Sequence, residues 1–298
     1  MKYLKLDDLI CDIGGENIIK FKTLKFSGGE QHITLEKAYK NHEESYKGAC
    51  TEVTIEVRLT NSDKVMLLFL ATDALRREGY EKISVFTPYL PYARQDRVCN
   101  VGEALSIKVI CTLINSQNYC NVYTLDNHSE VSTALLNNCV ELNTASIIMD
   151  AIGENSIPKA ADFKRYALVS PDAGALKKTY NLSKAMGGIP VIQCSKKRDV
   201  TNGDILGVSI SNASHDVKQY ENLIIVDDIC DGGRTFIELA KELRKHNGGH
   251  IKLFVSHGIF SKGTDVFKGL IEQVYTTNSF ENNYSNVITY KFEEENIK

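Results

Sequence analysis

The sequence lacks a long apolar run, a proline- or serine-rich stretch and a closely spaced pair of cysteines. Its longest apolar run, residues 65–71, falls far short of the roughly 20 residues that a membrane-spanning helix needs. Asp7 and Asp8 interrupt the apolar stretch at the N-terminus, so we expect neither a signal peptide nor a membrane partner. The eight scattered cysteines include no CxxC pair, which disfavours a zinc site or a disulfide framework and favours reduced thiols in a cytoplasmic protein.

An excess of one charge is also missing. Lys and Arg number 35 and Asp and Glu 38, which gives a net charge of −3 at pH 7 and predicts that nucleic acid is not a partner. The 298 residues are 43% hydrophobic and 24% charged, which is ordinary for a folded globular protein, and the length is typical of two domains.

Short apolar runs alternate with amphipathic segments along the chain. The strand-like runs are residues 53–57, 83–86, 122–125, 166–169, 223–226 and 253–255. The helix-like segments are residues 64–78, 173–186 and 235–246, the first with a potential cap at residues 61–63. This alternation predicts an α/β fold with two domains, residues 1–145 and 146–298, each a mainly parallel sheet flanked by helices. Ligands are then expected in the loops that follow the strands.

The most specific segment is LIIVDDICDGGRTFIELA, residues 223–240. A glycine loop that opens a helix can enclose an anion with backbone N–H groups, and a following Arg and Thr add donors. The paired carboxylates before the loop would repel a phosphate, so sugar hydroxyls or a bridging magnesium ion are their natural targets. A helix cap with solvated acids is the alternative. The candidate acceptor-binding residues are Asp227, Asp228, Asp231, Gly232, Gly233, Arg234 and Thr235.

Two basic segments could also carry chemistry. Arg94 and Arg97 in the segment RQDR follow a predicted strand and could hold the oxygens of a nucleotide triphosphate, although a salt-bridged turn would look the same. The run of residues 196–198, KKR, could be a solvated basic face or could stabilise charge on a transferring group.

Segment 223–240 resembles the phosphoribosyl-diphosphate motif of phosphoribosyltransferases and ribose-phosphate diphosphokinases. Further segments resemble the second family in order along the chain. They are FSGGE (26–30), TNSDKVMLLFLATDALRREG (60–79), FTPYLPYARQDR (86–97), TLDNHSE (124–130), VSPDAGALKK (169–178) and KKRDVTN (196–202). The chain therefore resembles the ribose-phosphate diphosphokinase family.

The resemblance implies two type I phosphoribosyltransferase-like domains with the active site between them. The implied reaction moves the β,γ-diphosphoryl group of ATP to the C1 hydroxyl of ribose 5-phosphate and leaves AMP. It assigns catalysis to Lys196 and Arg198 and magnesium binding to His128 and Asp172. The implied ATP-binding residues are Phe26, Glu30, Arg94, Gln95, Asp96, Arg97 and His128. It also implies a homo-oligomer, a dimer or higher, in which the loop at residues 26–30 reaches the nucleotide of a neighbouring subunit.

The chain departs from the family pattern at three places, one of them near Gly102, where the family has a further Arg after RQDR. Gly28 stands where the family has an Asp that helps to recognise adenine, and the loop DGGRT replaces DTAGT or DTGGT, which puts Arg234 beside the sugar phosphate. Three alternatives therefore stay open. They are the same transfer to a capped ribose 5-phosphate such as ADP-ribose, a phosphoribosyltransferase, and a non-catalytic regulatory homologue.

Overall fold

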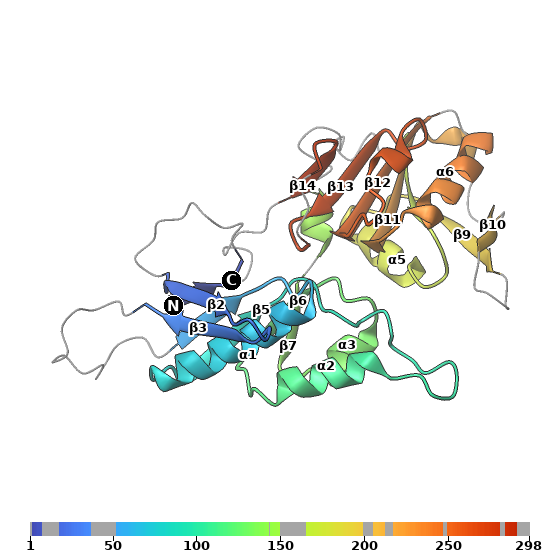
Figure 1. Ribbon diagram of the computed structural model, residues 1–298. Helices are drawn as coiled ribbons and strands as arrows, with labels where there is room; N and C mark the ends of the chain where they lie inside the picture. Colours follow the sequence, from blue (N-terminus) through green and yellow to red (C-terminus); the bar gives the residue numbers. More distant parts are fainter. Residues whose placement is uncertain are drawn as a thin grey trace. The chain divides into compact units, whose positions relative to one another are not determined.

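A computed structural model of the chain describes residues 2–7, 18–36, 52–142, 144–149, 165–198, 205–211, 217–246, 249–280 and 284–290 (Figure 1). The chain divides into two compact units, unit 1 with Met1–Leu142 and unit 2 with Asn143–Asn296. Each unit has its own mainly parallel sheet, of five strands in unit 1 and seven in unit 2, which confirms the predicted α/β class. Every helix in these ranges is too short or too polar to cross a bilayer.

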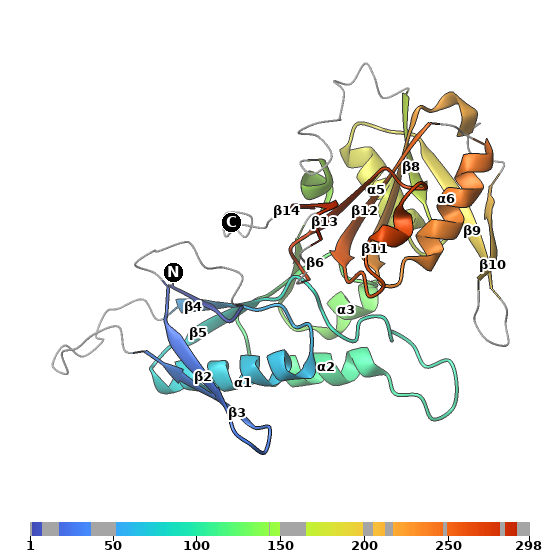
Figure 2. The ribbon, with the colours of Figure 1, turned by 45° about the horizontal axis from the view of Figure 1, so that its top comes forward.

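The sheet of unit 1 adds its strands in chain order, β1-β4-β5-β6-β7, with every pair parallel. The strands are β1 (Lys2–Lys5), β4 (Glu52–Glu56), β5 (Lys82–Phe86), β6 (Val122–Leu125) and β7 (Cys139–Leu142). The connecting helices are α1 (Ser62–Arg77), α2 (Ser106–Asn115) and α3 (Glu130–Leu135). Right-handed crossovers in a sheet that grows in one direction place their helices on one face, and α1 and α2 lie on the same side of the strands in Figures 1 and 2.

Helix α1 begins and ends near the predicted positions. The Asn61 side chain caps it, because its Oδ1 accepts a hydrogen bond from the Lys64 N–H at 3.0 Å. The chain leaves the helix at Gly79, whose φ of 89° is accessible to glycine at little cost. The buried face of α1 includes Leu68 and Leu75, which pack into the core of unit 1.

A buried ionic cluster lies where β1 and β4 end. The Arg58 side chain, 2% exposed, donates from Nη1 to Asp7 Oδ2 at 3.1 Å and lies 3.5 Å from Glu56 Oε1. Asp7 also accepts the backbone N–H of Arg58 at 2.7 Å and the Lys64 ammonium at 3.0 Å, and Lys5 lies 3.9 Å from Glu56. This cluster ties the edge strand β1 to β4 and to the start of α1.

A two-stranded antiparallel hairpin, β2 (Phe21–Lys25) and β3 (Gln31–Leu35), extends from unit 1. It contacts α1 through an ion pair between Lys25 Nζ and Asp63 Oδ2 at 2.7 Å. Leu24 and Phe26, two positions apart at this end of the hairpin, are 55% and 52% exposed. The hairpin is therefore fixed to α1 close to its tip, while Leu24 and Phe26 face solvent.

The seven strands of unit 2 have the order β10-β9-β8-β11-β12-β13-β14, and only β10 is antiparallel to its neighbour. The strands are β8 (Tyr166–Ser170), β9 (Val191–Arg198), β10 (Ile205–Ile210), β11 (Asn222–Cys230), β12 (His250–Gly258), β13 (Gln273–Thr277) and β14 (Val287–Tyr290). Helix α5 (Leu176–Ala185) connects β8 to β9, and α6 (Arg234–His246) connects β11 to β12. The chain thus leaves β8 in one direction and β11 in the other, so the strand order reverses between these two strands.

Candidate functional site

The predicted acceptor-binding residues gather at the carboxyl end of β11. This strand continues four residues beyond the predicted end at Val226 and includes Asp227 and Asp228. Asp172 follows β8, the parallel neighbour of β11. The structure therefore places these three carboxylates at the edge of the sheet where the strand order reverses, the position at which open α/β sheets bind ligands.

Backbone hydrogen bonds fix the orientation of the paired carboxylates. Asp227 Oδ1 accepts the Asp228 N–H at 3.0 Å, and Asp228 Oδ1 accepts the Ile229 N–H at 2.9 Å. Burial, together with the negative charges of Asp227 and Asp231, raises the pKa of the Cys230 thiol to about 12. Cys230 therefore stays protonated and uncharged at neutral pH. The charged groups at this end of β11 are the carboxylates.

The loop between β11 and α6 requires glycine at position 233. Gly233 has a φ of 77°, and a Cβ there would lie 2.8 Å from Phe267 Cζ. Its carbonyl accepts the N–H groups of Phe236 and Ile237, both at 3.0 Å, so it closes the first turn of α6. The helix consequently starts at Arg234, one residue before the predicted start, and the loop meets the N-terminal end of α6, where backbone donors and the helix dipole favour an anion.

The turn after β8 holds Asp172 in place. Its Oδ1 accepts the Ala175 N–H at 3.0 Å, and its carbonyl accepts the Ser170 hydroxyl at 2.8 Å. Helix α5 begins after this turn at Leu176, later than the predicted start at residue 173. The carboxylate of Asp172 is thus locally fixed just beyond the carboxyl end of β8.

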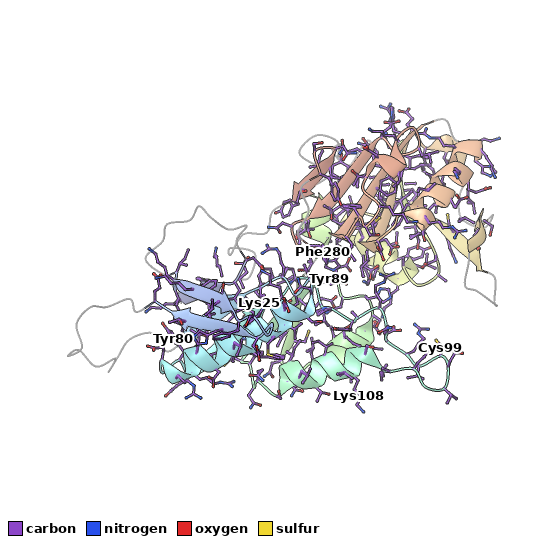
Figure 3. The ribbon with its side chains drawn as sticks, viewed as in Figure 1. Lys25, Tyr80, Tyr89, Cys99, Lys108 and Phe280 are labelled. Carbon is purple, nitrogen blue, oxygen red and sulfur yellow. The ribbon has the colours of Figure 1, made fainter. Side chains whose placement is uncertain are left out.

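In unit 1, two predicted ATP-binding segments come together. Arg97 Nε donates to Asp96 Oδ1 at 2.9 Å, which lowers the pKa of the Asp96 carboxyl, and the positive charge of His128 acts in the same direction. Asp96 belongs to the loop after β5 and His128 to the turn after β6, so the carboxyl ends of neighbouring strands supply both. Arg94, Gln95 and His128 are exposed. Figure 3 shows Cys99 farther along the same loop, toward its outer end.

The segment FSGGE forms the tip of the β2–β3 hairpin. The Phe26 N–H donates to the Glu30 carbonyl at 2.8 Å, and the Gly29 N–H donates to the Phe26 carbonyl at 2.9 Å. Gly28 leaves room for Glu30, because a Cβ at position 28 would lie 2.6 Å from Glu30 Oε2. The family pattern has an acidic side chain at position 28. In this chain the Glu30 carboxylate lies in the space that a side chain at position 28 would need.

The two predicted catalytic residues lie near the end of β9. The Cα of Lys196 is paired with Val208 and that of Arg198 with Ile205 of β10, across an irregularity in the register. Their side chains, and the rest of the predicted loop through Asn202, lie outside the described residues. Their roles stay predictions.

Sequence patterns missed two contributors to these segments. Tyr92 has a left-handed φ of 63°, rare for a bulky residue, and its hydroxyl lies 3.4 Å from Ser62 Oγ at the start of α1. Ser261, after β12, donates to Asp231 Oδ1 at 2.6 Å. Tyr92 lies within the segment FTPYLPYARQDR but was not among its candidate residues, and Ser261 lies outside every motif quoted above. The rule that ligands meet the loops after parallel strands could have drawn attention to both.

Comparison with known proteins gives matches in both units. Residues 2–117 match the family described as the N-terminal domain of ribose phosphate pyrophosphokinase, and residues 141–284 match the phosphoribosyl transferase domain. Together these matches span most of the chain.

Individual relatives agree with the domain matches. The chain is 30% identical over 227 residues to a ribose-phosphate pyrophosphokinase of Mycoplasmopsis pulmonis, across 74% of this chain and 66% of that protein. It is 28% identical to the protein of that name from Thermococcus kodakarensis, across 84% of this chain and 81% of the relative.

A solved structure shares the fold. The phosphoribosylpyrophosphate synthetase from Mycobacterium smegmatis aligns with a TM-score of 0.77 at 19% identity, across 97% of this chain and 94% of that chain. With the tandem domain matches and the curated relatives, the assignment is plain. The chain belongs to the ribose-phosphate pyrophosphokinase family, also called the ribose-phosphate diphosphokinases.

Proposed function

We propose that the chain transfers the β,γ-diphosphoryl group of ATP to the C1 hydroxyl of ribose 5-phosphate, which gives 5-phosphoribosyl 1-diphosphate and AMP. The observation that carries this proposal is the fixed pair Asp227 and Asp228, followed by the glycine loop and α6, in a chain that matches the kinase-specific N-terminal domain. A phosphoribosyltransferase is less well supported, because the N-terminal match is to the pyrophosphokinase domain.

In this proposal unit 2 holds the acceptor. The carboxylates of Asp227 and Asp228 would accept hydrogen bonds from ribose hydroxyls, and their fixed orientation reduces the ordering that binding requires. The loop of residues 231–235 would hold the 5-phosphate at the start of α6. Unit 1 would hold the nucleotide, with Phe26 offering its ring to adenine and Arg94 donating to phosphate oxygens.

Lys196 and Arg198 are proposed to stabilise the negative charge that spreads over the transferring diphosphoryl group. In-line attack by the C1 hydroxyl on the β-phosphorus forms one P–O bond and breaks the bond to the AMP oxygen. Positioning and electrostatic stabilisation carry most of the rate in such transfers. Asp227 or Asp228 could orient the attacking hydroxyl.

We also propose magnesium as the cofactor. The described residues contain no group of three His, Cys, Asp or Glu side chains that could enclose a metal ion. Magnesium does not need such a group, because it usually keeps several water ligands and is bound by one or two carboxylates together with substrate phosphates. Asp172 offers the oxygen that this hard ion prefers, whereas the imidazole of His128 is a weaker match. Bound magnesium would neutralise charge on the phosphates.

A direct test is incubation of the purified chain with ATP and a panel of sugar phosphates, with and without MgCl2, followed by mass spectrometry. We expect AMP and 5-phosphoribosyl 1-diphosphate from ribose 5-phosphate, and no product when magnesium is chelated. Product from ADP-ribose but not from ribose 5-phosphate would instead favour the capped acceptor. ATP that stays intact with every acceptor would contradict the proposed transfer.

We further propose that the chain acts as a homo-oligomer in which the hairpin tip contacts another subunit. The exposed Leu24 and Phe26 side chains support this proposal, since burying them at an interface would remove apolar surface from water. Mass photometry should show a dimer or larger species, and Leu24→Ser with Phe26→Ser should shift it toward monomer. A wild-type chain that is monomeric and fully active at assay concentration would exclude this role.

A further inference from the structure

The segment that follows β12 packs against the proposed acceptor loop. Strands β11 and β12 are parallel neighbours, with Cys230 paired to Gly258. The N–H groups of Ile259 and Phe260 both donate to the Cys230 carbonyl, at 2.9 and 3.0 Å. With the Ser261 hydroxyl on Asp231, these bonds join the two loops side by side as they leave the sheet.

The conformation of this segment is fixed. Phe260 has a left-handed φ of 47°, which is costly for an aromatic residue and persists only where the surroundings enforce it. Its buried ring packs edge-on against Phe267 and Tyr284, and its carbonyl accepts the Tyr284 hydroxyl at 3.0 Å. The Gly263 N–H donates back to the same carbonyl at 2.8 Å. Residues 260–263 therefore form a rigid turn beside the acceptor loop.

Lys262 lies in this turn, and its side chain covers Gly232. A Cβ added to Gly232 would meet Lys262 Cδ and Cε, each at 3.6 Å, which is ordinary van der Waals contact. The ammonium has no carboxylate within 4 Å in the described part of the chain. By contrast, Lys268 of the same connection pairs with Asp265 at 3.0 Å. The turn thus brings to the acceptor loop a cation that forms no ion pair with any described carboxylate.

We infer that Lys262 binds the phosphoryl group of the acceptor, as a second cation beside Arg234 at the Gly232–Gly233 loop. This inference rests on the proposed function for the identity of the ligand. Gly232 has no side chain of its own, so the stem of Lys262, up to the Cε that bears the ammonium, lies against it. A compact ammonium on a flexible stem is suited to a phosphate, which it meets as a point charge.

The test compares Lys262→Met, which keeps an unbranched apolar stem and removes the charge, with Lys268→Met as the matched control. Calorimetry would measure the dissociation constants of ribose 5-phosphate and of inorganic phosphate in 50 mM salt. A charge-assisted hydrogen bond at a partly exposed site corresponds to about 10-fold in affinity, so we expect Lys262→Met to weaken both ligands by about that factor. Lys268→Met should bind both ligands as the wild type does, and Lys262→Arg should restore most of the loss.

Further readouts separate the outcomes. The difference between wild type and Lys262→Met should shrink in 0.5 M salt, and KM for ATP should stay unchanged. Equal phosphate affinity in Lys262→Met and wild type would overturn the inference, and so would a wild-type chain that binds neither ligand. If wild type binds phosphate through Lys262 but forms no AMP with ribose 5-phosphate, the proposed function fails and the phosphate site stands.

Discussion

Lys196→Ala should lower kcat by ~10²–10³-fold and leave KM for ATP nearly unchanged, because a preorganised charge that acts on the transferring group stabilises the transition state more than the bound substrate. The residue lies near the end of β9, an inner strand of the unit 2 sheet, with its Cα opposite Val208 of β10. That backbone pairing gives the residue a defined place from which a positive charge can act.

The matched control for this experiment is Lys241→Ala. Lys241 lies on the outer face of α6, paired with Glu238 at 2.8 Å, and is assigned no part in the transfer. Steady-state rates of AMP release at saturating ribose 5-phosphate give kcat and KM for both variants. A near-normal kcat for Lys196→Ala would instead indicate that residues 196–198 are a solvated basic face that does not act on the transferring group.

Arg58→Ala should cost unit 1 about 3–5 kcal/mol of its free energy of unfolding, since removing one member of a buried ion cluster leaves the opposite charges buried and less well compensated. Asp7 has a fully buried carboxylate that takes a hydrogen bond from the Arg58 backbone and an ion pair from its guanidinium. The substitution keeps the first contact and removes the second, so the loss comes from the side chain.

Arg77→Ala is the control, because Arg77 also pairs with an Asp, Asp73 at 2.7 Å, but is 76% exposed at its side chain. It should leave the urea midpoint unchanged. Hydrogen exchange in β4 would assign the Arg58→Ala transition to unit 1, and Asp7→Ala with the double variant would complete a thermodynamic cycle. Additive losses would show that the two side chains do not stabilise unit 1 as a pair.

Sequence patterns located some of the elements whose residues are buried and missed others, such as helix α2 and strand β13. Residues 122–125 form β6 as predicted. Helix α1, residues 62–77, begins and ends within two residues of the prediction, because its apolar residues recur at the helical period and a capping residue precedes them. The hairpin β2–β3 was not predicted, since most of its side chains are exposed and no alternating apolar face marks it. The predicted strand ended four residues before the end of β11, because the paired acidic residues there are usual in loops.

The candidate site was predicted to the extent that it follows from local motifs. Asp227 to Thr235 form one contiguous segment, and the structure places them together as expected. Lys262 was missed, because its contact with Gly232 spans 30 positions and depends on the pairing of β11 with β12. Such contacts follow from sheet topology, which short motifs do not encode.

The two strand orders also have a consequence for how each unit folds during synthesis. In unit 1 the strands β4, β5, β6 and β7 are neighbours both in the chain and in the sheet, so each can pair as soon as it has been made. In unit 2, β8 can pair with β9 in chain order, but its other edge must wait for the central strand β11, which is made only after β9 and β10. Loop closure over that distance slows folding, so unit 1 should gain its protected amides first, and unit 2 should remain longer in a state that chaperones can bind.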